Sequence, residues 1–500
     1  MKKNSLIPFV LFALIVTLIM TTGPSFTQML DLDEFAFLPM VGNESVADSG
    51  PAPTSTMTPI VTSTSTAIAT ATSVATSEPT NTPTPDSSPT ATPTATPEPV
   101  TLGESWLASW MLNETNETSS IFSGVVVNVS SVYTSTVDGK VYQCIEASGM
   151  PNYDTLVSED LISSLNNRPR AAFEFGTGST TLNLGDSLPF GGDVGFTPAM
   201  GCTSGEDGFG YWPPGPACPE SQNKVQCFPM EPEPAMEVCE TGLNDIGTWV
   251  NGVSIFNWTD GQSYNNAGVW QNEAFHFEYY DLDICPGHSA NGNYHHHSNP
   301  VCLAEQLEDN GDGHSIIYGF AADGYPIYGP WQANDVLAKS CWKTRDYDDP
   351  ASPTGCGTAG ERSCVLVDQF DYTQGTEAAA SDGPSTSDTV TSMSSNTFTA
   401  TSGYYFEDYY YDAACTALGI EYLDEHNGHE HDDLGYHYHI TLSDDGDGTY
   451  TDVFPFYVGP TYAGTLQDNA IASCGTGGGM GGGPPGGGGG GPPGGGGGPP

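Results

Sequence analysis

Two low-complexity segments limit which of the 500 residues can pack into a core. From Pro51 to Val100, 33 of 50 residues are Ser, Thr or Pro, without any aromatic residue, Cys, Lys or Arg. At the other end, 24 of the last 26 residues are Gly or Pro. Neither composition can bury enough apolar surface to fold, so we expect a disordered stalk at residues 28–103 and a disordered tail at residues 475–500. The folded domain is then expected within residues 104–474.

The charge balance argues against two classes of protein. The chain has 61 Asp and Glu against 10 Lys and Arg, which gives a formal net charge of -51. Such a field repels phosphates and anionic lipid headgroups, so a nucleic-acid binder and a polybasic membrane-surface protein are close to excluded. The same field attracts metal cations. Hydrophobic residues make up 37% of the chain, which is enough for a core despite this charge.

The N-terminus has the order of a secretory signal. The basic start MKKNS is followed by the apolar run Leu6 to Met20 and then by a polar segment. We therefore expect residues 1–27 to direct export, so that the protein is extracellular or displayed at the cell surface. Because no clear A-x-A cleavage site follows, an uncleaved N-terminal anchor is the alternative.

Cysteine usage and chain punctuation predict the fold class. All twelve Cys lie in residues 144–474, and an even number in an exported chain predicts disulfides, with a thiolate metal site as the weaker alternative. Gly, Asn, Asp and Pro interrupt short apolar runs every 8 to 12 residues or so, which favours strands. One short helix is expected at Ser158–Leu165. A polar stretch at residues 373–403 is expected to be a disordered insert.

All eleven His lie in residues 276–439, where they belong to an internal repeat. Residues 282–297 contain Leu-Asp-x-x-x-Gly-His followed by Tyr-His-His-His, and residues 423–439 contain Leu-Asp-x-x-x-Gly-His followed by Tyr-His-Tyr-His. Downstream, residues 325–330 resemble residues 454–460. The sequence therefore predicts a mainly β, disulfide-stapled domain built from two related halves.

The downstream match also predicts an insertion. The segment between the His-rich motif and the downstream match is longer in the first half than in the second. We therefore expect an insertion in the first half, and this insertion contains Cys302 and His314.

Each copy places histidines where they can share a metal ion. Side chains alternate along a strand, so the two His of Tyr-His-x-His would project to one side, about 6.6 Å apart. A His from the preceding Gly-His would complete a three-His site with an open position, which suits zinc or copper. The candidate metal ligands are His288, His295, His297, His429, His437 and His439.

Two questions about these histidines stay open at this point. Asp283 and Asp424 are candidates to orient a ligating ring by accepting its other N–H. In a structural alternative, the His and Tyr side chains stack and hydrogen-bond across an interface between the halves. The duplication, in a chain that has no His outside residues 276–439, favours metal binding. It does not distinguish two separate sites from one shared site.

Other motifs give weaker indications. Two Asp/Gly loops, at residues 309–313 and 444–448, resemble the start of calcium loops but lack the Glu of an EF-hand at the twelfth position. Asp and Gly are also common in hairpins. The run YYFEDYYYD at residues 404–412 is either an aromatic surface for glycan or a buried antiparallel strand. Because nucleophile-elbow, phosphate-loop and dinucleotide motifs are missing, we assign no catalytic residue.

Several blocks, in order, resemble the YHYH domain family, which is named for the motif at residues 436–439. These blocks are NGVSIFNWTDGQSYNNAGVW, CPGHSANGNYHHHSNPVC, GHSIIYGFAADGYPIYGP, LDEHNGHEHDDLGYHYHITL and FPFYVGP. The resemblance covers residues 225–465. It implies a secreted or surface protein, and the family has no established biochemical activity.

Carried over by position, the family motif includes ten residues of this chain, namely Gly287, His288, Tyr294, His295, His297, Gly428, His429, Tyr436, His437 and His439. The chain departs from the motif because its first copy reads Tyr-His-His-His. In addition, His426 stands where the first copy has Cys285. Cys285 therefore has no repeat partner and is expected to pair elsewhere, with Cys302 as the candidate.

Three functions follow from these observations. The favoured one is an exported protein that binds a transition metal through its duplicated His sets. The second is a non-enzymatic cell-envelope or adhesion module with structural histidines, whose partner would be a cell-envelope polymer or glycan. The third is a metal-dependent hydrolase or oxidase, because an open three-His site can activate water.

Overall fold

The computed structural model describes residues 102–167, 179–194, 218–243, 245–280, 282–392, 396–431, 434–446, 448–467 and 470–475. The predicted signal segment, nearly all of the predicted stalk and the predicted tail after residue 475 lie outside the described residues. Within them the protein is mainly β with a few short helices, as the sequence predicts. None of the helices in this part of the chain has the length and apolar character of a membrane span.

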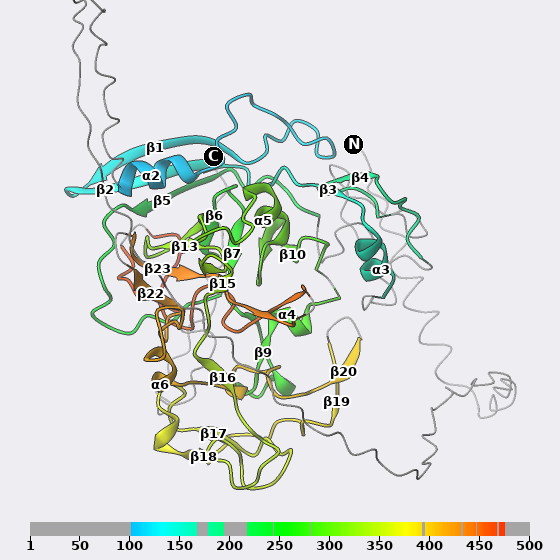
Figure 1. Ribbon diagram of the computed structural model, residues 1–500, viewed down its shortest axis with the longest axis vertical. Coiled ribbons are helices and arrows are strands. Elements are labelled where there is room, and N and C mark those ends of the chain that lie inside the picture. Colours follow the sequence, from blue (N-terminus) through cyan, green and yellow to red (C-terminus); the bar gives the residue numbers. More distant parts are fainter. Residues whose placement is uncertain are drawn as a thin grey trace, which may run out of the picture. The chain divides into compact units, whose positions relative to one another are not determined.

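An eight-stranded sheet forms the centre of the domain (Figure 1). Its strands are β6 (Asp245–Trp249), β7 (Ser254–Phe256), β10 (Gly287–Ala290), β11 (Asn293–His296), β12 (Ile317–Ala321), β13 (Pro326–Tyr328), β22 (Gly428–His431) and β23 (Gly435–His439). Their order across the sheet is β10-β11-β7-β6-β12-β13-β23-β22. Both His-rich motifs therefore lie in hairpins at the two ends of this sheet.

The strands pair in the same way in both halves of the sheet. In each half one hairpin, β6–β7 or β12–β13, pairs in parallel with a His-rich hairpin, β10–β11 or β22–β23. The register is also equivalent, because Ile255 is the pairing partner of His296 in the first half and Ile327 is the pairing partner of Tyr438 in the second. The halves meet where β6 and β12 pair antiparallel. The order of strands thus gives each His-rich hairpin the same position relative to the hairpin that pairs with it.

Two glycines allow the halves to meet closely. A Cβ on Gly247 of β6 would lie 2.7 Å from the carbonyl oxygen of Phe320, and one on Gly319 of β12 would lie 2.7 Å from that of Thr248. Real Cβ atoms do not approach carbonyl oxygens this closely, so any side chain there would push β6 and β12 apart. The central pairing therefore depends on glycine at both positions.

The predicted downstream repeat is wrong. Residues 325–330 include β13 of the sheet, but residues 454–460 form turns and no strand. By strand pairing, the equivalent of residues 325–330 is residues 253–258. The longer connection therefore lies in the second half, where residues 329–427 join β13 to β22, whereas residues 257–286 join β7 to β10. A short local likeness in sequence does not predict which strands are equivalent, because register is set by pairing across the sheet.

A three-stranded sheet adjoins the central one. It consists of β1 (Val129–Val137), β2 (Lys140–Ala147) and β5 (Lys224–Pro229), in that order, and helix α2 (Leu102–Ser109) precedes it (Figure 1). The ring of Trp110 packs on Phe228 of β5 at 5.7 Å between centroids and on Phe320 of β12 at 5.1 Å. Burial of these large rings ties the two sheets into one core, since a buried aromatic side chain stabilises by about 1.5–3 kcal/mol.

The remaining elements are short. Paired strands are β3 (Asp154–Leu156) with β4 (Ser187–Pro189), β8 (Thr259–Ser263) with β9 (Gln271–Glu273), β14 (Trp331–Ala333) with β15 (Val336–Leu337), β16 (Trp342–Thr344) with β21 (Tyr409–Tyr411), β17 (Cys364–Leu366) with β18 (Thr376–Ala378), β19 (Thr389–Thr391) with β20 (Thr397–Thr399), and β24 (Leu442–Asp444) with β25 (Tyr450–Asp452). Helices are α3 (Glu159–Asn167), α4 (Ala274–Phe277), α5 (Val301–Leu307), α6 (Ala413–Thr416), η1 (Tyr264–Asn266), η2 (Tyr372–Gln374) and η3 (Phe406–Asp408). Helix α3 confirms the predicted helix, and Ser158 caps it by accepting the N–H of Leu161 at 3.0 Å.

Disulfides form, as the Cys count predicts, and they join residues that are 8 to 235 positions apart in sequence. The bonds among the described residues are Cys144–Cys227, Cys239–Cys474, Cys285–Cys302, Cys341–Cys415 and Cys356–Cys364. The expected pairing of Cys285 with Cys302 is confirmed, and it attaches α5 to the turn before β10. Cross-links of this kind stabilise a fold mainly by restricting its unfolded chain.

The expectation of a disordered insert at residues 373–403 is wrong for its described part. This stretch contains β18, β19 and β20. The guanidinium of Arg362, fully buried, donates to the carbonyl oxygens of Pro384, Ala400 and Thr401, each at 2.8 Å. It also forms a two-point ion pair with Asp408 at 2.7 and 2.8 Å. One buried cation thus organises a segment whose composition alone suggests disorder.

The aromatic run at residues 404–412 supplies a buried strand. Tyr409, Tyr410 and Tyr411 form β21, which pairs antiparallel with β16, and the rings of Tyr409 and Tyr411 are buried. Tyr405 is also fully buried. The buried-strand interpretation of this run is therefore confirmed for residues 409–411.

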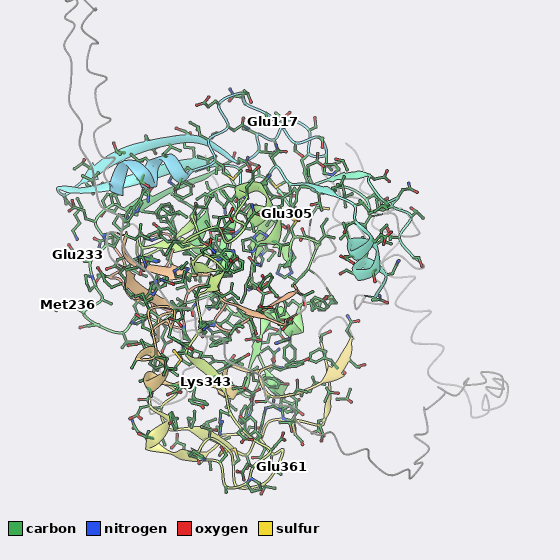
Figure 2. All side chains as sticks on the ribbon, in the orientation of Figure 1. Glu117, Glu233, Met236, Glu305, Lys343 and Glu361 are labelled. Carbon is green, nitrogen blue, oxygen red and sulfur yellow. A yellow bond between two sulfur atoms is a disulfide. The ribbon has the colours of Figure 1, made fainter. Side chains whose placement is uncertain are left out.

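Arg362→Met is expected to lower the free energy of unfolding by about 3–5 kcal/mol, because it leaves the buried Asp408 carboxylate without its counter-ion. Urea denaturation measures this change. The matched control is Lys343→Met, which breaks the partly exposed pair of Lys343 (labelled in Figure 2) with Asp412 at 2.9 Å. This control should cost less than about 1 kcal/mol. Equal effects of the two substitutions would contradict the account.

Candidate metal centres

Site one consists of His288, His295 and His297, the three His predicted from the first copy. His288 on β10 lies directly opposite His295 on β11, and His297 follows the end of β11. All three are buried, and their ligand atoms lie within 4.8 Å of one another. Nε2 of His295 is 3.0 Å from Nε2 of His297. The hairpin therefore brings the three rings to a common point.

A carboxylate that the sequence did not indicate also belongs to site one. Glu278 directly follows α4, and its Oε2 lies 3.4 Å from Nε2 of His297 and 3.6 Å from Nε2 of His288. Glu278 is at most partly exposed, with a side-chain exposure of 24%. Site one can therefore offer three imidazoles and one carboxylate oxygen.

Site two consists of His429, His437 and His439, predicted from the second copy, together with His314 from the segment between α5 and β12. Nε2 of His437 lies 3.2 Å from Nε2 of each of the other three rings. His429 and His437 face each other across β22 and β23, as His288 and His295 do in site one. The two predicted sets thus form two separate clusters, and the second contains a fourth His.

Backbone carbonyls orient the rings of His295, His297, His314, His429, His437 and His439 through Nδ1. The Nδ1-to-oxygen distances are 2.9 Å for His295 to Asn293, 2.6 Å for His297 to Asn257, 2.9 Å for His314 to Ser315, 2.6 Å for His429 to Ile420, 2.8 Å for His437 to Gly435, and 2.7 Å for His439 to Gly329. A carbonyl oxygen only accepts, so each Nδ1 must carry the proton. In neutral rings, Nε2 then holds a lone pair.

This tautomer leaves neighbouring Nε2 atoms unable to bond to one another. His295 and His297 face each other as two acceptors 3.0 Å apart, and His437 does the same with its three neighbours at 3.2 Å. A hydrogen bond needs one donor, so these converging lone pairs are suited to sharing a cation. A tetrahedral ion with Zn–N bonds of 2.0–2.1 Å separates its nitrogens by about 3.3–3.4 Å, close to the spacing in both clusters.

Burial keeps these imidazoles neutral. Desolvation, followed by repulsion from neighbouring His, lowers the pKa of His437 to about 3, and desolvation with the same kind of repulsion lowers that of His297 to about 3. The pKa of His429 falls to about 4, and those of His295 and His439 fall well below the ordinary value. Neutral imidazole is the form that binds metals, so these five histidines are in ligand form at neutral pH.

Residues 226–446 match the family model described as YHYH protein. The chain carries a YHYH domain. The match includes all six predicted ligands as well as Glu278 and His314. No curated protein and no solved structure matches the chain.

The tyrosine of the YHYH domain motif has a structural role in each hairpin. The hydroxyl of Tyr294 donates to Asp283 at 2.7 Å, and that of Tyr436 donates to Asp424 at 3.0 Å. Each Asp also accepts the N–H of the motif glycine at 3.0 Å. Asp283 and Asp424 thus hold the tyrosine and the turn of each hairpin. The prediction that Asp424 orients a ligating ring is wrong, because backbone carbonyls orient His429, His437 and His439.

The remaining sequence candidates lie apart from these clusters. His296, on the other face of β11, packs against Trp249 in the core at 6.4 Å between ring centroids. The Asp/Gly loops are not among the groups of His, Cys, Asp or Glu that converge within the described residues. The strands on either side of the second loop, β24 and β25, instead pair antiparallel with each other. The calcium prediction thus has no support.

Gly428→Ala is expected to destabilise the YHYH domain by on the order of 1–3 kcal/mol, since a Cβ there would collide with the hydroxyl of Tyr436. The control is Gly313→Ala, where a Cβ meets nothing within 4 Å. This control should change stability by about 0.5 kcal/mol or less. Urea denaturation in chelator gives both values, and a neutral Gly428→Ala would contradict the assigned role.

Metal-free protein should lose stability through its His clusters as pH falls below about 6.5. The unfolded chain takes up protons there, while folded His437, with a pKa of about 3, does not. At pH 5.5 this costs about 1.4 kcal/mol for each such His. Buried Glu407 and Asp323, with pKa values raised by desolvation to about 7 and about 6, act in the opposite direction.

The His contribution is isolated by comparing variants. The difference in unfolding free energy between pH 7.5 and pH 5.5 is measured in chelator for the wild type and for His437→Gln. The variant should lose less stability on acidification, by about 1.4 kcal/mol. The same pH dependence in both proteins would contradict a buried, neutral His437.

Proposed function

We propose that this protein is an exported metal-binding protein whose YHYH domain holds two transition-metal ions in two separate sites. The supporting observation is the set of six Nδ1–carbonyl hydrogen bonds, which turn the Nε2 lone pairs of each cluster toward one point. Neutral imidazole with a carboxylate suits zinc, and four imidazoles suit zinc or copper. The high negative charge of the chain raises the local concentration of cations.

Export is part of this proposal. The N-terminal signal-like segment and the five disulfides between described residues support it. Disulfides form and persist in oxidising compartments, so they fit an extracellular or surface-displayed protein. The predicted stalk would hold the YHYH domain away from the cell.

The alternative with purely structural histidines is less well supported. Structural His pairs need one donor and one acceptor, but the converging Nε2 atoms of His295 with His297, and of His437 with its neighbours, are all acceptors. A metal-dependent hydrolase or oxidase needs a substrate-binding group as well as the ion. We therefore assign metal binding and no reaction.

Elemental analysis of the purified, dialysed protein tests this proposal. The wild type, loaded with zinc or copper, should retain about two ions per chain. The double substitution His295→Ala with His297→Ala should leave about one, and so should His437→Ala with His439→Ala. The control is His276→Ala, because His276 belongs to neither cluster, and it should retain both ions. A folded wild type that retains neither zinc nor copper would overturn the proposal.

A further inference from the structure

A cavity of about 410 Å³ lies next to site one. Its wall is formed by β8 and η1, by β9 and the end of α4, and by β19, and it includes Asp260, Asn265, Asn272, Glu278 and Tyr405. Figure 1 shows β9 and α4, in green, near the β19–β20 hairpin, in yellow. The volume falls within the range of about 300–1,000 Å³ typical of small-molecule sites. Glu278 is shared, because it lines the cavity and also contacts two rings of site one.

Two residues of this wall each have a buried polar atom without a hydrogen-bond partner among the described residues. One is Oδ1 of Asn272, a residue that is only 8% exposed and whose Nδ2 donates to Asp260 at 3.0 Å. The other is the hydroxyl of the fully buried Tyr405. Native proteins pair nearly all such groups, so each unpaired group calls for an explanation. An acceptor and a donor in one wall match a ligand that both donates and accepts.

The rest of the wall indicates the class of ligand. Amides and hydroxyls such as those of Asn265, Asn266 and Thr391 are combined with the rings of Tyr264 and Phe277. Aromatic faces carry partial negative charge and attract the C–H groups of a ring. Among the described residues, the wall contains carboxylates but no Lys, Arg or His, so an anionic ligand is disfavoured.

We propose that this cavity binds a neutral saccharide. Sugar hydroxyls both donate and accept, which suits Asn272 and Tyr405, and the C–H face of a pyranose suits the aromatic rings. The contact of Glu278 with site one would place the sugar beside the metal ion. The inference goes beyond metal binding and does not depend on it, since protein residues alone form the cavity wall.

Saturation-transfer NMR on the full-length protein tests the proposal. The probes are glucose, galactose, N-acetylglucosamine, maltose and cellobiose, each at millimolar concentration, with glucuronate as the anionic comparison. Each probe is added to metal-free and to metal-loaded protein, so that failure of metal binding is recorded separately. At least one neutral sugar should bind in both states, and more tightly than glucuronate.

Two variants locate the binding. Tyr405→Phe removes a hydroxyl that has no partner in the described residues, so thermal unfolding should be unchanged while saccharide affinity falls about fivefold to tenfold. Asn272→Leu should also weaken binding. The control is Tyr450→Phe on β25, which is 45% exposed and outside the cavity wall, and it should bind as the wild type does. No bound neutral sugar, glucuronate bound at least as tightly, or binding unaffected by both cavity variants would each overturn the proposal.

Discussion

Hydrogen bonds from imidazole Nδ1 to backbone carbonyls decide where the rings of both His clusters point. Four of these bonds form two equivalent pairs, since Asn293 and Gly435 orient His295 and His437, while Asn257 and Gly329 orient His297 and His439. The accepting carbonyls belong to the same strands and turns that pair the hairpins in parallel. Ring orientation is thus fixed by the sheet itself, which is a more rigid support than a flexible carboxylate side chain.

The two halves share this strand arrangement, but their clusters differ in the side chain that joins the three histidines of the hairpin. Site one has the carboxylate of Glu278, which follows α4, and site two has the imidazole of His314, from the segment that joins the halves. A carboxylate lowers the net charge of a metal site by one, whereas an imidazole leaves it unchanged. The sites are therefore expected to differ in affinity and in preferred metal, although their strands are equivalent.

Local periodicity explains how much of the site could be predicted from the sequence. The six His of the hairpins were found because strand alternation and duplication act over a few residues. Glu278 and His314 carry no such signal, since their positions depend on tertiary packing and neither has a counterpart in the other half. The same limit explains why the sequence predicts disorder at residues 373–403. Arg362, which lies outside this stretch in sequence, orders it through hydrogen bonds to its carbonyl oxygens. The downstream repeat was misplaced because a six-residue likeness cannot reveal strand pairing.

Tautomer-resolved NMR tests the central claim most directly. Long-range ¹H–¹⁵N correlation spectra of protein labelled at histidine nitrogens, loaded with diamagnetic zinc, report which ring nitrogen carries the proton and which binds the ion. We expect His295, His297, His314, His429, His437 and His439 to be protonated at Nδ1 and bound to zinc through Nε2. Rings protonated at Nε2, or spectra that zinc leaves unchanged, would contradict the account.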